Sequence, residues 1–383
     1  MHNKFGKLVL KIVAFFTLVF LINYSIAHAE EFPTSANAAY VLDLKTNTVL
    51  YNKNGDTPLP PASMSKLMTI YVLFDALKQK KVTLDSAFTV SEKAWRIQGS
   101  KMFVPIHEQV KVEDLIRGII IQSGNDACIV VAEGLSGSEE EFAKLLNKKA
   151  KEIGLTNSHF VNASGWPEPN HVMSVKDLAI LAKRLIEDFP EYYHYFSEEE
   201  FVFNGIKQGN RNPLLYKDKN YSADGLKTGH TEEAGYGLTA SAVRDERRVI
   251  VVLHGLKNMQ ERADESRRFM SWAFDSFEAK KLVTKDTVID ELPVPYGTIK
   301  TVPVVTEKDV FVTLPRNADI TMHAKTILPA YIKAPVKAGE KIGILTVSAD
   351  NIEPIEIPLL AKNDVEKEGF LEHITTSFEL LWQ

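Results

Sequence analysis

The sequence predicts an α/β or α+β domain, built on one sheet with inserted helices, followed by a small all-β domain. Strand-like segments occur near the start of the first domain and again near its end, and segments with helical spacing lie between them, as in folds that cover a sheet with helices. From about residue 283 to residue 361, short β-rich runs alternate with Pro, Gly, Asn and Asp. That spacing predicts a separate β-sandwich domain over 283–361, and we find no catalytic constellation in it.

Residues 1–29 have the features of a cleaved signal peptide. Three lysines lie within the first eleven residues, residues 12–22 form an apolar run, and Ala27-His28-Ala29 predicts cleavage before Glu30. The alternative is a retained membrane anchor, but the apolar run is shorter than the roughly 20 residues that span a bilayer. We therefore expect an exported, periplasmic protein.

Composition argues against several classes of function. Removing residues 1–29, which hold three lysines and no acid, changes the formal net charge from −5 to −8, whereas nucleic-acid-binding surfaces are basic. The single cysteine, Cys128, has no partner for an internal disulfide. His107-Glu108 begins like a zinc-binding helix, but Lys111 stands where the second histidine is required. We predict no nucleic-acid partner, no metal and no cofactor.

The first domain is predicted to begin with two strands and a buried helix. Residues 38–51 place β-branched and aromatic residues on both sides of a Lys45-Thr46-Asn47 turn. A helix is expected from Ser63 to about Gln79, because proline is tolerated at a helix start and apolar residues surround the helix. Helical spacing recurs at 112–134, 139–153 and 174–186.

The end of this domain is predicted to return to the sheet. A charged turn at 244–247 separates two of its strands, and a helix over 263–277 closes the unit. The expected strands lie at 225–228, 235–243 and 248–254. The β-rich runs of the following domain include 300–305, 310–314 and 342–347.

Residues 368–383 are predicted to form a C-terminal amphipathic helix. An apolar face that ends in Leu381 and Trp382 favours a helix lying in a membrane interface. The polar face carries glutamates, however, where membrane-surface helices usually carry Lys and Arg. A tail helix packed on the β-domain is the alternative.

Three short motifs in a fixed order supply the candidate site, and the first is Ser63-Met64-Ser65-Lys66. It is the single Ser-x-x-Lys of the chain. Residues three apart share one face of a helix, so Lys66 can take the proton of Ser63 once its pKa is lowered by burial or by a second cation. Lys227 is the obvious second cation. Alone, the motif is more typical of an ordinary helix-start serine.

The second motif, Ser123-Gly124-Asn125, lies in a polar junction between apolar segments at 119–121 and 129–131. A loop or a helix cap explains these residue types equally well. The functional hypothesis gives Ser123 a hydroxyl that relays protons. Asn125 then supplies an amide that both donates to and accepts from a peptide backbone.

The third motif is Lys227-Thr228-Gly229, near a predicted strand. A glycine there lets a ligand approach the backbone closely, and Lys227 and Thr228 can hold a carboxylate by charge and hydrogen bond. A charged strand end followed by a turn is the alternative. Together, the three motifs predict an active-serine site that binds a peptide ending in a carboxylate.

The residues around these motifs resemble the low-molecular-mass penicillin-binding proteins, in particular the serine-type D-alanyl-D-alanine carboxypeptidases of peptidase family S11. The likeness covers about residues 32–278, and the β-domain and terminal helix match the family's later architecture. It implies a β-lactamase/transpeptidase-like domain over 30–278, with an antiparallel sheet and an inserted helical region. The segments that carry it are Pro61-Ala62-Ser63-Met64-Ser65-Lys66-Leu67-Met68-Thr69, Ser123-Gly124-Asn125-Asp126-Ala127-Cys128, Asn210-Arg211-Asn212 and Asp224-Gly225-Leu226-Lys227-Thr228-Gly229-His230-Thr231.

The resemblance implies a mechanism. Ser63 attacks the carbonyl between the two terminal D-alanines of a peptidoglycan stem pentapeptide, releases D-alanine, and leaves an acyl-enzyme that water hydrolyses. Lys66 is the implied base and Ser123 the implied relay to the leaving amine. β-Lactam antibiotics acylate the same serine. The implied substrate-binding residues are Asn125, Lys227, Thr228, Gly229 and His230, with the backbone N–H groups of Ser63 and His230 as the oxyanion hole.

The resemblance also supports a terminal helix that is peripheral on the outer face of the cytoplasmic membrane. Arg262 is a weaker candidate for holding the carboxylate, and we expect it to be a surface residue at a helix start. Among alternatives, a class A β-lactamase needs a glutamate in Glu-x-x-Leu-Asn, but Ala143 precedes Leu146-Asn147 here. A peptidoglycan endopeptidase and a non-catalytic wall-binding scaffold stay open.

Overall fold

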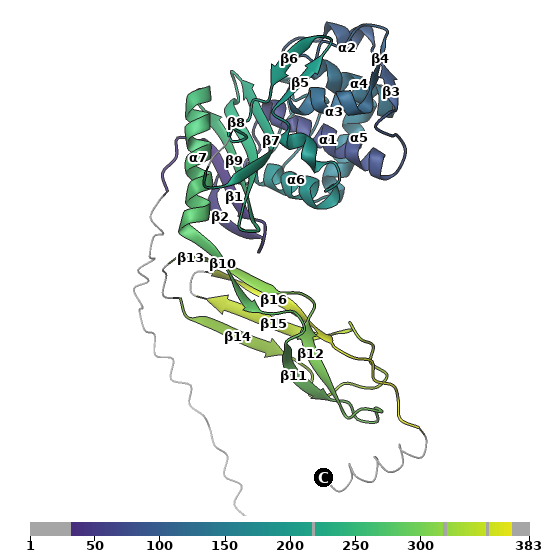
Figure 1. Cartoon of the computed structure of the whole chain (residues 1–383), viewed down its shortest axis with the longest axis vertical. Coiled ribbons are helices and arrows are strands. Elements are labelled where there is room, and N and C mark those ends of the chain that lie inside the picture. Colours follow the sequence, from purple (N-terminus) through teal and green to yellow (C-terminus); the bar gives the residue numbers. More distant parts are fainter. Residues whose placement is uncertain (1–31, 217–218, 317–319, 350–351, 370–383) are drawn as a thin grey trace, which may run out of the picture. The chain divides into compact units, whose positions relative to one another are not determined.

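The computed structural model describes residues 32–216, 219–316, 320–349 and 352–369 (Figure 1). The signal peptide over 1–29 and nearly all of the terminal helix over 368–383 therefore lie outside the described residues, and both stay predictions. In the described ranges, no helix is long and apolar enough to cross a membrane.

A five-stranded antiparallel sheet, in the order β2-β1-β9-β8-β7, forms the centre of the first domain. β1 and β2 are joined by a turn at Asn47, which has a φ of 57°, a left-handed conformation that asparagine tolerates. β7 is an edge strand of this sheet, so the third motif lies at the sheet's edge. The strands are β1 (Ala38–Asp43), β2 (Thr48–Lys53), β7 (Ser222–Thr231), β8 (Gly235–Arg244) and β9 (Arg247–Leu256).

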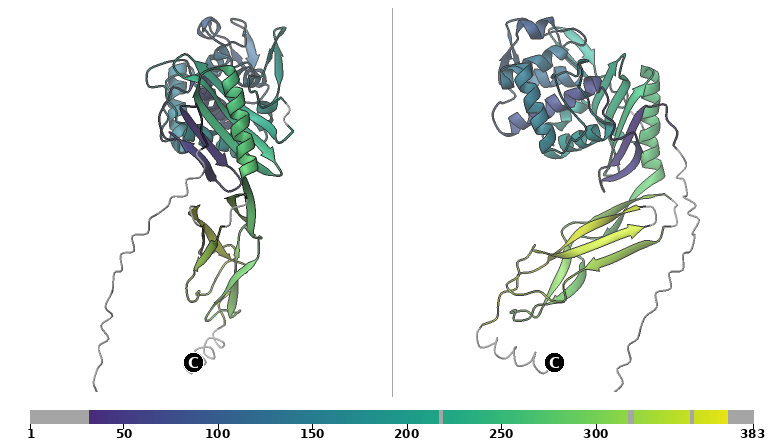
Figure 2. Two further views of the ribbon diagram at one scale, coloured as in Figure 1. Left: turned by 90° about the vertical axis from the view of Figure 1, so that its left-hand side faces the viewer. Right: turned by 180° about the vertical axis from the view of Figure 1, so that it is seen from behind.

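Helices cover both faces of this sheet. α7 (Met259–Ser276) lies along one face, as the left view of Figure 2 shows, and α6 (Val175–Asp188) packs on the other. All six residues of β1 are buried, as expected for a strand covered on both sides. α7 begins four residues earlier than predicted, because the side chain of Asn258 accepts from the N–H of Glu261 and caps the helix.

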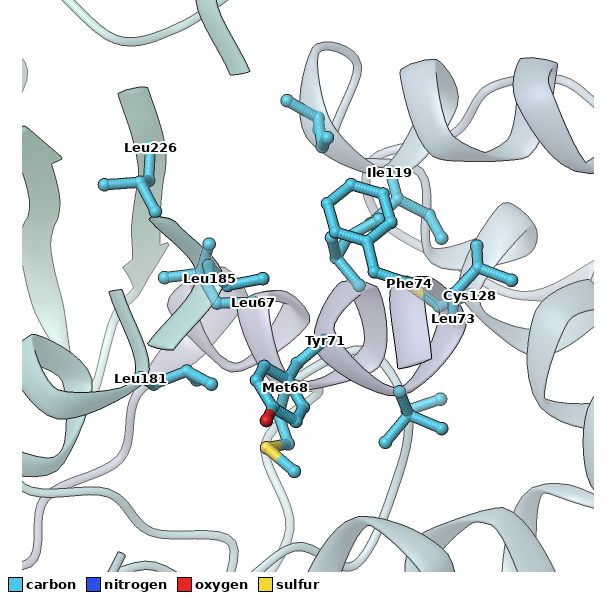
Figure 3. Packing of buried hydrophobic residues seen from close by; sticks show 14 of the residues in the cluster. Leu67, Met68, Tyr71, Leu73, Phe74, Ile119, Cys128, Leu181, Leu185 and Leu226 are labelled. Carbon is cyan, nitrogen blue, oxygen red and sulfur yellow. The ribbon is translucent and has the colours of Figure 1, made fainter. Parts of the chain in front are cut away.

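The predicted helix after the proline pair is present and buried. It begins as a 3₁₀ turn, η1 (Ala62–Ser65), and continues as α1 (Lys66–Lys78). From Lys66 to Leu77, every residue of α1 except Asp75 is buried. Figure 3 shows Leu67, Met68 and Phe74 of α1 in one apolar cluster with side chains of β7, α3, α4 and α6. The packing of this helix fixes the position of the first motif.

The inserted region surrounds α1 with further helices. The helix predicted over 112–134 is interrupted, because Ser123 has a φ of 58° that no α-helix accommodates. Ser138 caps α5, because its side chain accepts from the N–H of Glu141 and so satisfies a free donor at the helix start. The elements of the inserted region, besides α1 and α6, are β3 (Ala87–Thr89), α2 (Glu92–Arg96), β4 (Gln109–Lys111), α3 (Val112–Ile120), α4 (Asn125–Ser136), α5 (Glu139–Glu152), η2 (Tyr193–Ser197), β5 (Glu200–Phe203) and β6 (Ile206–Gly209).

From Phe277 onward, the regular elements of the described residues are all strands, as the sequence predicted for this domain. β10 (Phe277–Val283) pairs with β13 (Val310–Pro315), and a five-stranded antiparallel sheet has the order β11-β12-β16-β15-β14. Its own apolar core includes Leu292, Val302, Val304, Leu345 and Leu359. The other strands are β11 (Val288–Pro293), β12 (Thr301–Thr306), β14 (Met322–Ile327), β15 (Lys341–Ala349) and β16 (Ile352–Ala361).

Candidate active site

The first motif brings a serine and a lysine into direct contact. Ser63 is half-buried in η1, and Lys66 is the first residue of α1. The Lys66 ammonium Nζ donates to Ser63 Oγ at 2.9 Å and to the carbonyl oxygen of Ser164 at 2.6 Å. The predicted one-turn spacing is therefore confirmed as a hydrogen bond, and a second bond from a distant loop fixes the lysine's direction.

Burial sets the protonation behaviour of this lysine. Only 1% of the Lys66 surface is exposed, and burial, with a smaller contribution from the Arg211 cation, lowers the pKa of Lys66 to about 8. The sequence suggested Lys227 as the cation responsible. The effect runs the other way: burial and the positive charge of Lys66 hold the pKa of Lys227 well below its usual value.

The second motif forms the junction between α3 and α4. Gly124 is required there, since a Cβ would lie 2.8 Å from Asp126 Oδ1 and 3.0 Å from the backbone nitrogen of Met102. The hydroxyl of Ser123 is buried and has no hydrogen-bond partner in the described part of the chain. Asn125 Nδ2 donates to the carbonyl oxygen of Gln98 at 2.8 Å.

The loop that faces this junction is held by one carboxylate. Asp126 accepts from four backbone N–H groups, at 2.8 Å from Met102, 2.8 Å from Phe103, 3.2 Å from Val104 and 2.9 Å from Ala127. Bonds of this kind to an ionised acceptor are the strong ones. Asp126, the residue after the second motif, therefore fixes the position of residues 102–104 beside the site.

The third motif lies on β7 and approaches the nucleophile turn closely. Lys227 and Thr228 are buried, and Lys227 Nζ contacts the carbonyl oxygen of Thr228 at 3.2 Å. A Cβ at Gly229 would lie 2.9 Å from the carbonyl oxygen of Pro61. Glycine is needed here so that the edge strand and η1 can meet. The His230 side chain is exposed and stacks on Tyr236, with ring centroids 3.8 Å apart.

Comparisons with known proteins agree with this geometry. The family model of D-alanyl-D-alanine carboxypeptidases, peptidase S11, matches residues 25–258, and the model of the C-terminal domain of penicillin-binding protein 5 matches residues 277–367. The chain belongs to the D-alanyl-D-alanine carboxypeptidase family. The expected family, fold and enzyme class are thereby confirmed.

Individual relatives of this carboxypeptidase cover most of the chain. The D-alanyl-D-alanine carboxypeptidase DacC of Escherichia coli K12 is 38% identical over 346 residues, which is 88% of this chain and 86% of the relative. Penicillin-binding protein 5 of Haemophilus influenzae superposes with a TM-score of 0.80 at 36% identity, over 88% of this chain and 98% of that one. Penicillin-binding protein D2 of Listeria monocytogenes, solved in its ampicillin-bound form, gives a TM-score of 0.58 at 30% identity, over 63% and 98%.

The carboxypeptidase site contains two arginines whose importance the sequence did not reveal, the exposed Arg211 and the buried Arg262. Arg211 donates to Ser100 Oγ at 2.8 Å and to the carbonyl oxygen of Gln122 at 3.2 Å. Arg262 is 7% exposed and lies over the ring of Tyr236 at 5.7 Å, so the expectation of a surface arginine is wrong. Arg262 lies on the buried face of α7, in the first turn of the helix. The sequence contained one indication of Arg211, because Asn210-Arg211-Asn212 is among the segments that resemble the family.

The loop around residues 160–166 contacts the nucleophile turn and the first turn of α1. Besides the Ser164 bond to Lys66, Thr69 Oγ1 donates to the carbonyl oxygen of Ala163 at 2.6 Å. In the described ranges, Lys66 bonds to no carboxylate, and Ala143 lies buried within α5. The glutamate expected of a class A β-lactamase therefore has no counterpart beside this lysine.

Proposed function

We propose that Ser63 is the nucleophile of this carboxypeptidase and Lys66 its general base. The 2.9 Å contact between Lys66 Nζ and Ser63 Oγ carries this proposal. A serine hydroxyl needs a base within hydrogen-bond reach to become reactive. Because burial lowers the pKa of Lys66 to about 8, a useful fraction of the amine is neutral near pH 7 and can accept the serine proton.

The bond from Lys66 to the Ser164 carbonyl has a second consequence for the proposed base. A carbonyl oxygen accepts a hydrogen bond from either the ammonium or the neutral amine. The 2.6 Å contact therefore holds Nζ in place in both protonation states, while its lone pair turns toward Ser63. Among the described residues, no carboxylate is bonded to Lys66 that would keep it charged.

Ser123 is proposed to relay the proton from Lys66 to the leaving D-alanine amine. Its hydroxyl is buried without a protein partner, and a buried hydroxyl of this kind calls for an explanation. A hydroxyl both donates and accepts, so it suits a relay. The left-handed φ of 58° at Ser123 turns the chain at this point, as is common for residues held in functional sites.

The terminal carboxylate of the substrate is proposed to bind at Lys227 and Thr228. Burial, together with repulsion by Lys66, Arg211 and Arg262, holds the pKa of Lys227 well below its usual value. The carboxylate of Asp126, which also acts on the charge of Lys66, is occupied by four backbone N–H groups. An arriving anion relieves this repulsion, so the site favours a substrate that ends in a carboxylate.

The substrate is proposed to be the peptidoglycan stem pentapeptide, with the amides of Ser63 and His230 as oxyanion hole. β-Lactams are proposed to acylate the same serine, and the ampicillin-bound form of the Listeria penicillin-binding protein D2 supports this. Removing one oxyanion donor costs roughly 3–4 kcal/mol in comparable enzymes.

We also propose that the mature chain is exported and peripheral on the outer face of the cytoplasmic membrane. The signal-peptide features of residues 1–29 and the amphipathic pattern of residues 368–383 support this. Deleting residues 370–383 should move the protein from the membrane fraction to the soluble fraction. A full-length mature protein that is already soluble would contradict the anchor.

The test of the site uses a fluorescent penicillin and a D-Ala-D-Ala pentapeptide. The wild type should be labelled and should release D-alanine, and Ser63→Ala should do neither while its melting temperature stays unchanged. Ser65→Ala is the matched control on the same turn, and it should still be labelled. Labelling of Ser63→Ala would show that another residue is the nucleophile. Labelling of the wild type without D-alanine release would favour a sensor or scaffold.

A further inference from the structure

The β-domain contains a cavity of about 380 Å³ at one end of its five-stranded sheet. β11, β14 and β16 run in the same direction, because β11 and β16 both pair antiparallel with β12, and β14 and β16 both pair antiparallel with β15. The segments that follow these three strands therefore leave the sheet at the same end. The cavity is lined by residues 295–296, 331–334 and 367–368 of these segments. The proposed mechanism at Ser63 uses none of this space.

Main-chain hydrogen bonds tie the three segments together. The N–H of Glu368 donates to the carbonyl oxygen of Tyr296 at 3.0 Å. The N–H of Ile332 donates to the carbonyl oxygen of Pro293, the last residue of β11, at 2.9 Å. The cavity walls are therefore set by the fold itself. A cavity formed in advance binds a ligand at lower entropic cost.

Two exposed lysines, Lys333 and Lys367, line this cavity, and we call them the cavity lysines. Neither forms an ion pair with any residue that the structure describes. The two carboxylates next to Lys367 in the chain each pair with a lysine outside the lining. Glu368, whose side chain is 2% exposed, meets Lys300 at 2.7 Å, and Glu366 meets another such lysine at 2.9 Å. The lining therefore has a net positive charge that is open to an anionic ligand.

Apolar and aromatic side chains accompany the cavity lysines. Tyr296 and Tyr331 are part of the lining. Tyr331 is 50% exposed, and Ile299, in the turn that continues from Tyr296, is 51% exposed. Ile327 at the end of β14 is exposed as well. Lysines and tyrosines beside exposed apolar groups are the residue types that occur at a membrane–water interface. This end of the β-domain therefore has the composition of a membrane-facing surface.

The predicted amphipathic segment, residues 368–383, begins at this cavity, since Glu368 lies in the lining. The polar face of that segment carries glutamates, whereas membrane-surface helices usually carry Lys and Arg. The chain without residues 1–29 is also acidic overall, so an anionic membrane repels it unless basic groups face the lipid. The cavity lysines supply the cations that the segment lacks.

We propose that this cavity binds the phosphate group of an anionic membrane lipid between Lys333 and Lys367, as a membrane contact separate from residues 370–383. This inference rests on the proposed location at the membrane and is independent of the chemistry at Ser63. A lysine ammonium is a compact charge that binds phosphate oxygens. The tyrosine rings suit the boundary between headgroups and acyl chains, because each has an apolar body and a polar hydroxyl.

The test measures binding of the full-length mature protein to two kinds of vesicle. One kind is an equimolar mixture of phosphatidylglycerol and phosphatidylcholine, and the other is phosphatidylcholine alone. Cosedimentation at about 0.1 M salt should show tighter binding to the anionic vesicles. Lys333→Gln and Lys367→Gln should each weaken that binding about fivefold, and the double variant about 30-fold, the effect expected of basic residues near an anionic surface. Binding to phosphatidylcholine alone should be unchanged.

The matched control removes the same charge from the opposite end of the β-domain. Lys285 and Lys308 are exposed residues that do not line the cavity. They lie before β11 and after β12, which are antiparallel, and so at the end of the sheet away from the cavity. The double variant Lys285→Gln and Lys308→Gln should bind anionic vesicles as the wild type does. An equal loss in this variant would overturn the site, because it would show that only net charge matters.

Deletion of residues 370–383 separates this site from the predicted anchor. The deletion should weaken binding to both kinds of vesicle, and the cavity lysines should contribute the same factor in the shortened chain. Loss of that factor on deletion would show that the lysines act through the segment, and would overturn the site. So would a double variant that binds anionic vesicles normally, or one that loses binding to lipid-free cell wall instead. If the deletion changes nothing while the double variant weakens binding, the proposed anchor fails and the site stands. Penicillin should label every variant as it labels the wild type, which confirms that the variants fold.

Discussion

The pH dependence of acylation tests the proposed base most directly. An isolated lysine with its ordinary pKa of 10.5 would be neutral in about one molecule in three thousand at pH 7. With the pKa of Lys66 lowered to about 8 by burial, about one molecule in ten is neutral. Burial therefore increases the reactive population about 300-fold.

The rate constant for acylation of Ser63 by penicillin should follow this population. It should rise about tenfold per pH unit below pH 7 and level off above an apparent pKa of about 8. Stopped-flow measurement with a fluorescent penicillin between pH 6 and pH 9 checks the profile. A flat profile across this interval, or one that levels off at pH 6.5, would refute Lys66 as the base.

A substitution shows that the profile belongs to Lys66. The Arg211 cation lowers the pKa of Lys66, so Arg211→Gln should move the midpoint of the profile to higher pH. Arg96→Gln removes an exposed arginine on α2 that pairs with Glu92, and its midpoint should match the wild type. A purely structural role for Arg211 would change the plateau rate without moving the midpoint.

Three further predictions follow from the contacts around the site. Gly229→Ala should slow penicillin acylation at least tenfold, because its Cβ would lie 2.9 Å from the Pro61 carbonyl oxygen; Gly209→Ala, which meets only ordinary contacts, should not. Asp126→Asn should lower the free energy of unfolding by about 2–3 kcal/mol in urea titrations, and a loss below about 0.5 kcal/mol would show that the four N–H bonds matter little. The folded pKa of His171 is lowered from 6.5 to about 4, so the unfolded chain binds more protons and stability falls as pH drops from 6.5 to 4, by about 3 kcal/mol. His171→Gln should remove that loss, and an unchanged pH slope would contradict the assignment.

The close approach of β7 to the nucleophile turn explains how one site combines residues from three distant segments. Gly229 and Gly165 each lack the Cβ that would collide with Pro61 and Ala62. Replacing either glycine by alanine would force backbone atoms apart, because the Cβ would collide with a main-chain oxygen. The nucleophile turn is therefore clamped from two sides, by an edge strand and by a loop.

Short-range chemistry was sufficient for much of the fold. The apolar surround of α1 predicted a buried helix, and the turn at Asn47 and the charged turn before β9 marked the sheet's hairpins. The pairing of Ser63 with Lys66 depends on a separation of three residues, which local helical geometry converts into a contact. These features depend on neighbours within a few positions, so the amino-acid order alone determines them.

The tertiary structure decided what these residues can do. The pKa of Lys66 depends on exclusion of water, and its position depends on a bond to Ser164, which is 98 positions away; no local pattern encodes either. The same holds for Arg262, which the sequence placed at the surface and α7 packs inward, and for the junction at Ser123 that interrupts a predicted helix. The sequence thus determined which groups are present and their order. Only long-range packing decided which of them lose water, and loss of water is what tunes a lysine into a base.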